Sequence, residues 1–191
     1  MTTTCTSLEN ETLATVPMSV EEFKEISDIQ QEILQMVADD KSKESILISL
    51  CQLNESLLPN AVASIMIKDK ETGLMSVLSA PSIPEEGHDA LKGLRPGPGG
   101  GSCGNAVFRN QAQYVKNTFT DERWEDIRKI AHDFNLCSCW SMPIRDKEGK
   151  SIGSFALSSF EHREPSAFHK MLLDVSAFIV GVVLRKNAKK S

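Results

Sequence analysis

A β-hairpin is encoded by residues 138–159, SCWSMPIRDKEGKSIGSFALSS. Two strand-like runs, 138–144 and 151–159, flank the polar turn Asp146-Lys-Glu-Gly149. Strands joined by so short a turn pair in the antiparallel direction. We therefore expect a mainly antiparallel sheet that contains this hairpin.

A second hairpin and several short elements are predicted upstream. Strands are expected over 62–68 and 74–80, with a turn at 69–73 between them. Short helices over 85–91 and 105–109, a glycine-rich loop at 93–104 between them, and a strand over 113–116 are expected to follow. Thr120 is expected to cap a further helix, whose apolar face carries Trp124, Ile127, Ile130, Ala131 and Phe134.

Longer amphipathic helices are predicted at the two ends of the chain. Ser19-Val-Glu-Glu22 is a capping box, followed at helical spacing by Phe23, Ile26, Ile33, Leu34 and Val37. A second helix is predicted from Ser42 to Pro59, and the last over 166–186, where the apolar residues are Phe168, Met171, Leu172, Val175, Phe178, Ile179 and Val182. This pattern predicts an α+β fold with an antiparallel sheet of five to six strands. We expect the terminal helices on one face and a ligand pocket on the other, beneath the glycine-rich loop and the Trp124 helix.

Length and composition indicate one globular domain. Of the 191 residues 40% are hydrophobic and 25% are charged, so the chain can bury a core without disulfides or metals. We expect a disordered segment over 1–18, one domain over 19–187 and a basic tail over 188–191.

The charge, the apolar stretches and the cysteines of the sequence limit which partners and which cellular compartment are expected. The net charge is -5 and no basic face with interleaved aromatic residues occurs, so no nucleic-acid partner is expected. The N-terminus lacks a signal peptide, and the longest apolar stretch, 177–184, is too short to span a bilayer, so no membrane association is expected. Five cysteines, at positions 5, 51, 103, 137 and 139, lack the spacing of a disulfide framework, which favours a reducing, cytoplasmic location.

The glycine-rich loop Arg95-Pro-Gly-Pro-Gly-Gly-Gly-Ser-Cys-Gly104 is the most unusual segment. So many glycines indicate a backbone that something approaches closely or that adopts positive φ. The loop is neither a phosphate-binding loop nor a dinucleotide fingerprint. Two interpretations stay open: a tight covering loop, or a loop that cradles a ligand.

Cysteines are the other residues for which the sequence suggests a chemical role. Cys103 lies near a helix N-terminus, where a thiol pKa can be lowered, although most free cysteines are simply small buried residues. Cys137 and Cys139 alternate along a strand and could form a redox pair or merely pack. Two thiolates without further ligands do not make a zinc site, so no metal site is predicted.

Three motifs together resemble one known family. They are Gly101-Ser-Cys-Gly104, Thr120-Asp-Glu-Arg-Trp124 and Cys139-Trp-Ser-Met-Pro-Ile144, supported by Ala80-Pro-Ser-Ile-Pro84, Gly153-Ser-Phe-Ala156 and Arg163-Glu-Pro165. Over about residues 22–186 the chain resembles a GAF domain of the subfamily common in bacterial sensor kinases and diguanylate cyclases. The resemblance implies a PAS/profilin-like fold and gives pocket-lining, ligand-binding roles to Gly101, Ser102, Cys103, Gly104, Trp124, Cys139, Trp140 and Ser141. The chain departs from the family at Cys137, where arginine is usual, and at Ser158-Ser159, where tyrosines are usual.

The resemblance implies a free-standing sensor that binds an unidentified small molecule or a redox signal. The Cys-His dipeptide of bilin binders and the residue set of cyclic-nucleotide binders are missing, and His132 is the first candidate for a haem ligand, so the cofactor stays unknown. We expect the signal to reach a signalling protein through the terminal helices, which could also form a homodimer.

Three alternatives are kept open. A thiol enzyme similar to free methionine-R-sulfoxide reductase would use Cys103, which stands in a similar Gly-x-Cys-Gly setting, but that family's Gly-His-Ile-Ala-Cys-Asp segment is absent. A redox switch would use Cys137 or Cys139. An adaptor would have its pocket filled by its own side chains. We favour a sensor without catalytic activity.

Overall fold

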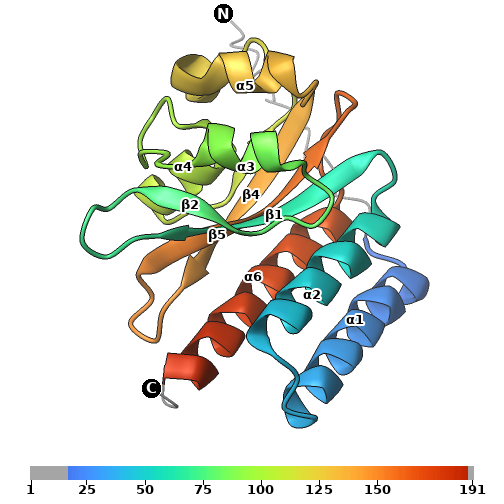
Figure 1. The fold of residues 1–191 in the computed structure, drawn as a ribbon. Coiled ribbons are helices and arrows are strands. Elements are labelled where there is room, and N and C mark those ends of the chain that lie inside the picture. Colours follow the sequence, from blue (N-terminus) through green and yellow to red (C-terminus); the bar gives the residue numbers. More distant parts are fainter. Residues whose placement is uncertain (1–16, 189–191) are drawn as a thin grey trace, which may run out of the picture.

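A five-stranded antiparallel sheet is the centre of the computed structural model, which describes residues 17–188 (Figure 1). The strand order is β2-β1-β5-β4-β3, and every neighbouring pair is antiparallel. The strands are β1 Ala61–Lys68, β2 Met75–Ser79, β3 Gln113–Val115, β4 Ser138–Arg145 and β5 Ser151–Ser159. The predicted α+β fold is confirmed. The expected disorder of the N-terminal segment concerns residues that, apart from 17 and 18, lie outside the described part, as do 189–191 of the basic tail.

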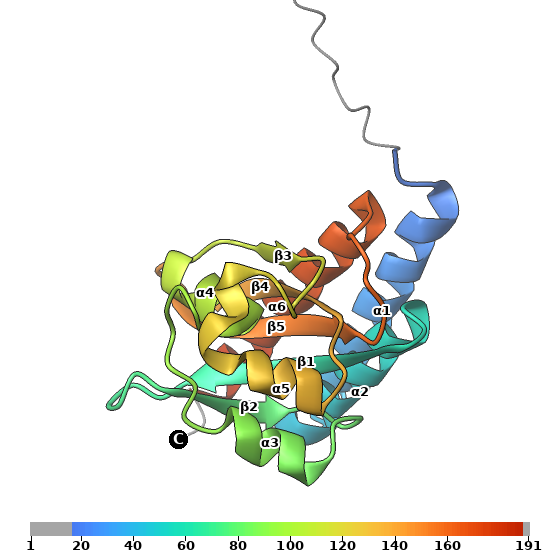
Figure 2. The ribbon, with the colours of Figure 1, turned by 90° about the horizontal axis from the view of Figure 1, so that it is seen from above.

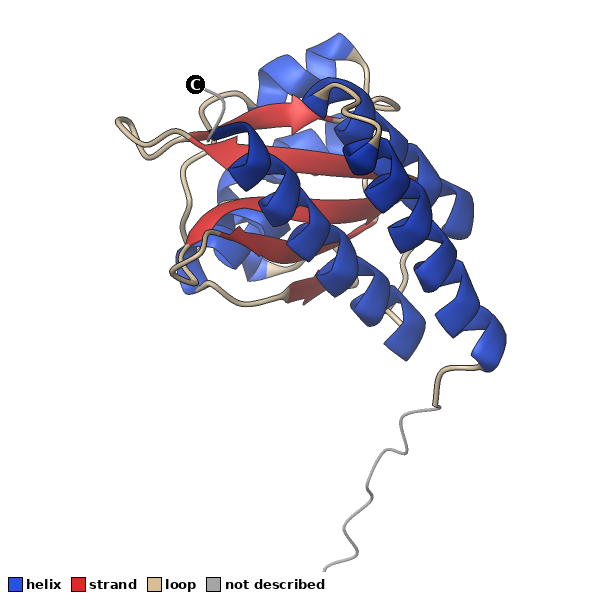
Figure 3. Cartoon of the chain, turned by 90° about the horizontal axis from the view of Figure 1, so that it is seen from below, coloured by secondary structure: helices blue, strands red, loops and turns tan. Residues whose placement is uncertain are grey.

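The helices divide between the two faces of the sheet. On one face lie α1 Val20–Ala38, α2 Lys43–Leu57 and α6 Ala167–Ala188, as expected for the terminal helices (Figure 3). On the other face lie α3 Glu85–Leu91, α4 Gly101–Arg109, the 3₁₀-helix η1 Glu122–Ile127 and α5 Arg128–Asp133 (Figure 2). The sheet therefore separates a layer of long helices from a layer of short helices and loops.

The β4–β5 hairpin closes as its sequence predicts. Gly149 adopts φ +79° in the turn, and the Asp146 amide donates to the Lys150 carbonyl at 2.9 Å. In β5, a Cβ on Gly153 would lie 2.8 Å from Ile67 Cδ1 on β1 and even closer to the carbonyl oxygen of Met66 on the same strand. Only glycine fits there, so β5 can approach β1 closely.

The larger core lies between the sheet and the long helices. Its largest fully buried side chains include Trp140, Phe155, Leu172 and Ile33. Cys139 and Ala156 belong to a separate cluster on the other face. Because consecutive strand residues point to opposite faces, β4 and β5 supply both layers.

Two predicted elements on the pocket face differ from the structure. The helix predicted over 105–109 begins at Gly101, because the Gly104 amide already donates to the Gly100 carbonyl at 3.0 Å. The helix expected to be capped by Thr120 is capped by Asp121, whose side chain accepts from the Arg123 amide at 3.0 Å. It starts as η1 and becomes α-helical only from Arg128.

Part of the apolar face expected on the terminal helices points to solvent. Phe23 and Leu34 on α1 are 53% and 58% exposed, and Phe178 on α6 is 68% exposed. Helix α1 packs on α2 and α6 at the outer edge of its layer, so it buries only a narrow stripe, formed by Ile26, Ile29 and Ile33.

Helix α6 alone among the described helices is long and apolar enough to cross a membrane. The segment is Ala167–Lys186, 20 residues with mean hydropathy 1.8, and half of it is buried inside the domain. Leu172 and Val180 are fully buried in the larger core, so this helix packs as a core helix of the fold.

Candidate functional site

An apolar pocket of about 240 Å³ opens on the short-helix face of the sheet, beneath α3 and α5. It is lined by Val62, Ser82, Ile83, Pro84, Gly87, Leu91, Ile130, Phe134, Leu136 and Phe160. None of these side chains is charged, and Ser82 alone among them is polar. The pocket can therefore accept a small uncharged molecule, and it is somewhat smaller than the usual range for drug-sized ligands.

Close packing of α3 shapes this pocket. A Cβ on Gly87 would lie 2.6 Å from Ile83 Cγ2 and 3.5 Å from Phe134 Cε1. Glycine at this position lets α3 lie close to Phe134, which follows α5. At the rim, the Phe160 amide donates to the Asn60 carbonyl at 2.9 Å, which fixes the backbone that carries this partly exposed ring.

A larger and more open hollow of about 640 Å³ lies elsewhere, between α2, β2 and α3. Its lining includes the charged residues Lys43, Glu44 and Glu85. The smaller pocket is the better candidate site, because enclosure by apolar side chains is what most small-molecule sites share.

The glycine-rich loop is approached closely by side chains of the chain itself. Gly101 has φ +67°, and a Cβ there would lie 2.6 Å from Ile127 Cδ1 and 3.5 Å from the Trp124 ring. A Cβ on Gly99 would overlap the carboxylate of Asp126. Trp124 and Ile127 thus fill the space beneath the loop and the first half of the predicted Trp124 helix, and the hollow lies under its second half, α5, and under α3.

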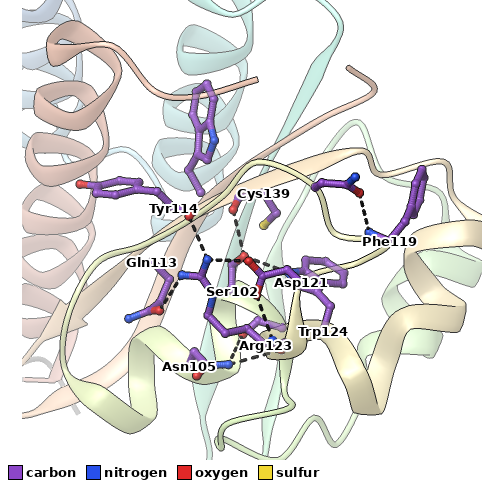
Figure 4. Close-up of polar contacts among 12 residues, drawn as sticks. Ser102, Asn105, Gln113, Tyr114, Phe119, Asp121, Arg123, Trp124 and Cys139 are labelled. Carbon is purple, nitrogen blue, oxygen red and sulfur yellow. Dashed lines mark hydrogen bonds and ion pairs between the residues drawn. The ribbon is translucent and has the colours of Figure 1, made fainter. Parts of the chain in front are cut away.

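A chain of hydrogen bonds ties η1 to α4 and α4 to β4 (Figure 4). Trp124 Nε1 donates to Ser102 Oγ at 3.1 Å, and Ser102 Oγ donates to the Cys139 carbonyl at 2.9 Å. Asn105 Nδ2 donates to the carbonyls of Pro98 and Gly101 at 2.8 and 2.9 Å. All three donor residues are buried, so these bonds hold the loop rigidly against the sheet.

Arg123 of η1 and Asp121 at its N-cap are paired within the protein. Arg123 pairs with Asp121 at 2.7 Å, and its Nη1 and Nη2 also donate to Gln113 Oε1 and the Tyr114 carbonyl, both at 3.2 Å (Figure 4). The hydrogen bond from the Arg123 side chain is the main reason that the pKa of the Asp121 carboxyl is lowered. These bonds attach η1 to β3, and they occupy the guanidinium of Arg123.

The structure brings seven of the eight predicted site residues together. Gly101, Ser102, Cys103, Gly104, Trp124, Cys139 and Ser141 lie on the short-helix face, where α4 covers β4 and β5. Trp140 lies on the opposite face, so the prediction that it lines a pocket beneath the loop is wrong. Its Nε1 donates to the Arg163 carbonyl at 3.3 Å, and its ring lies 5.1 Å from that of His169. Strand alternation explains the difference, because Trp140 lies between Cys139 and Ser141.

None of the eight residues lines the apolar pocket, so their ligand-binding role stays a prediction. The residues that do line it were not predicted as ligand-binding residues, although Ile130 and Phe134 were placed on the apolar face of the helix expected over the pocket. The available signals were Pro84 at a helix start and Gly87 inside the same short helix.

The histidines and cysteines form no cluster of three or more metal-binding side chains among residues 17–188. His132, the haem candidate, stacks on Phe119 with ring centroids 4.5 Å apart and is not part of the pocket lining. The four described cysteines are free thiols. Burial raises the pKa of Cys51 to about 12, whereas the pKa of Cys103 is lowered to about 7.

A family model and two kinds of relatives are similar to this chain. A family model described as GAF domain matches residues 40–185. The methyl sulfide methyltransferase-associated sensor of Methanosarcina acetivorans is 24% identical over 163 residues, which is 85% of this chain but only 16% of that protein. The chain therefore spans about a sixth of the length of this curated relative.

Solved structures share the fold at low identity. The GAF domain of a phosphoenolpyruvate-protein phosphotransferase from Coxiella burnetii is 15% identical, with a TM-score of 0.72 over 88% of this chain and 96% of that one. Free methionine-R-sulfoxide reductase from Neisseria meningitidis, solved with its substrate, is also 15% identical, with a TM-score of 0.71 over 92% of this chain and 96% of that one. Because this one fold serves a domain of a transferase and a reductase, it does not by itself identify the activity.

Proposed function

The chain belongs to the GAF domain family, and from this premise we propose that it is a sensory, regulatory domain that binds a small uncharged molecule. The similarity to a protein named as a sensor supports the sensory role. The apolar pocket of about 240 Å³ is the observation that carries the ligand class. We extend the domain over 19–187, because α6 packs on the sheet and α1 packs on α6 and α2.

A carboxylate connects the pocket wall with the long helices. Glu55 on α2 accepts from Ser82 Oγ at 2.6 Å and from the Ala63 amide at 2.8 Å. Ser82 lines the pocket, and Ala63 follows the pocket residue Val62 on β1. A ligand that moves either wall would therefore move α2, which packs on α1 and α6.

A second copy of the chain is the proposed partner at the long helices. Large apolar side chains stand exposed on both terminal helices, namely Val20, Phe23, Leu34, Met171 and Phe178. A homodimer through α1 and α6 would bury them and would place two pockets under the control of one helical bundle. A signalling protein would then receive the change in helix packing.

The role as a binding domain without catalytic activity is likewise proposed. The similarity to the reductase is at the level of the fold alone. Thioredoxin-coupled NADPH consumption with free methionine sulfoxide tests it, and we expect none above the protein-free rate. Turnover that disappears in Cys103→Ser would replace this proposal with the reductase. The free thiols among residues 17–188 are consistent with a reducing compartment, and we place the protein in the cytoplasm.

Calorimetric titration with indole, and with indole-3-carboxylate as its charged analogue, tests the ligand class. We expect indole to bind and the carboxylate to bind at least tenfold more weakly, because the pocket offers a charge no partner. Leu91→Trp fills the pocket and should abolish indole binding. Leu78→Trp is the matched control, because Leu78 lies on β2 outside this pocket. Equal binding of indole by both variants would place its site elsewhere.

A further inference from the structure

Two cysteines far apart in the sequence meet beneath α4. Cys103 lies in the first turn of α4, and Cys139 lies on β4, where its carbonyl accepts from Ser102 Oγ, the neighbour of Cys103, at 2.9 Å. Both pack in the apolar cluster around Trp124 and Ala156. The pair suggested by the sequence was different, because Cys137 and Cys139 alternate on a strand. In the structure, however, Cys137 Sγ lies against the Asn135 carbonyl at 3.7 Å.

The surroundings of the pair favour a thiolate on one sulfur and a thiol on the other. The groups that face Cys103 are Cys139 and Ser141 from β4 and Ser154 from β5, and all of them can donate a hydrogen bond. The bond from Cys139 is the main cause that lowers the pKa of Cys103 to about 7, against the opposing effect of burial. The pKa of Cys139 is raised well above its ordinary value by that same bond and by burial.

The buried hydroxyl of Ser154 is a second feature of this site. Ser154 is fully buried, and its Oγ has no hydrogen-bond partner within residues 17–188. A buried hydroxyl without an acceptor is costly, and native structures rarely keep one without a reason. Negative charge on Cys103 would supply the acceptor, which agrees with the direction in which Ser154 shifts the Cys103 pKa.

We propose that Cys103 and Cys139 form a reversible redox couple, in which a peroxide oxidises Cys103 and Cys139 then closes a disulfide. The Cys103 thiolate attacks one peroxide oxygen, so that an S–O bond forms, the O–O bond breaks and hydroxide leaves. Cys139 then attacks the sulfur of the resulting sulfenic acid, and the hydroxyl departs with the Cys139 proton as water. A dithiol reductant restores both thiols by exchange and is itself oxidised to a disulfide.

The two cysteines differ in solvent access and in pKa, and both differences favour Cys103 as the residue that is oxidised first. As whole residues, Cys103 is partly buried and Cys139 is fully buried, so we expect a peroxide to reach Cys103 first. A disulfide would then fasten α4 to β4 beside the Trp124–Ser102 hydrogen bond. This redox couple does not depend on the apolar pocket, so it can fail while ligand binding stands, and the reverse also holds.

The test is peptide mapping of the purified chain after titration with hydrogen peroxide and alkylation. We expect one intramolecular Cys103–Cys139 cross-link, which dithiothreitol reverses. In Cys139→Ser the oxidation should stop at a sulfenic acid on Cys103 that dimedone traps, and in Cys103→Ser no cross-link should form. Cys51→Ser is the matched control and should behave as the unmodified sequence, because Cys51 is buried elsewhere, beside Ser79.

The rate of alkylation provides a second measurement that needs no variant. At pH 7, Cys103 should react with iodoacetamide about threefold faster than a thiol of the ordinary pKa of about 8.5, because a roughly 16-fold gain in thiolate outweighs a roughly fivefold loss of nucleophilicity. The proposal is overturned if Cys103 reacts no faster than a peptide thiol of ordinary pKa. It is also overturned if peroxide links other cysteines, or if it links separate chains instead of Cys103 and Cys139.

Discussion

At the residue scale, position 101 requires glycine for two reasons, its backbone conformation and the lack of space for a side chain, and a control variant separates them. Its φ of +67° disfavours any side chain, and a Cβ there would also press on Ile127. We expect Gly101→Ala to lower the free energy of unfolding by about 2–3 kcal/mol, the sum of a left-handed backbone penalty and local overpacking. Urea denaturation measures it.

Gly149→Ala is the control for the packing part. Gly149 has φ +79°, but a Cβ there meets nothing within 4 Å. Only the backbone penalty of about 1 kcal/mol should remain. Equal losses in the two variants would show that Ile127 yields freely and that the loop is not tightly packed.

Single residues also show how far the sequence could predict the site. Ser19 and Glu22 were recognisable as a capping box, and both reciprocal hydrogen bonds are present, because such a motif involves only neighbours in the chain. Cys103 and Cys139 could not be paired in the same way. Their proximity depends on how α4 lies on the sheet, which is a tertiary property that no local pattern contains.

At the element scale, acid should weaken the attachment of η1 to β3. The pKa of Asp121 is lowered in the folded chain by Arg123, so its stabilisation is present above the unfolded pKa of about 3.9 and is lost as pH falls through the folded value. Asp121→Asn should flatten the fall in stability at acid pH, as followed by urea denaturation at several pH values. Asp133→Asn, which removes an exposed ion pair on α5, should leave that slope nearly unchanged.

Helix α2 should lose its coupling to the pocket in Glu55→Gln. The variant weakens two hydrogen bonds to a carboxylate, and we expect a loss of about 1–2 kcal/mol in stability. Indole should still bind, but it should no longer change hydrogen exchange along α2. Glu44→Gln, an exposed change on the same helix, should keep that response. A response that survives in Glu55→Gln would exclude this carboxylate as the link.

The elements themselves were mostly predictable, since hydrophobic periodicity is a local property. The β4–β5 hairpin followed directly from its strands and turn. Helix α4 was predicted too short, because four residues of its first turn are Gly101, Ser102, Cys103 and Gly104, which are poor helix formers in isolation. Packing on β4 and β5 overrides that preference.

At the scale of the whole molecule, the proposed dimer makes a direct prediction. Phe178→Glu puts a charge into the exposed apolar face of α6 and should weaken self-association at least tenfold, or about 1.4 kcal/mol. Light scattering after size-exclusion chromatography at several concentrations measures it. Phe108→Glu is the control, because Phe108 is exposed on α4 on the other side of the sheet. A chain that is monomeric at every concentration would remove the dimer.

The two sides of β4 and β5 can change independently in evolution. Cys139 and Ala156 contribute to the cluster on the short-helix face, while Trp140 and Leu157, the next residues along the same strands, contribute to the core beneath the long helices. Substitutions at alternate positions can therefore give the domain a new stimulus while its output surface keeps its shape. The specificity for a stimulus and the specificity for a partner can thus change separately within the β4–β5 pair.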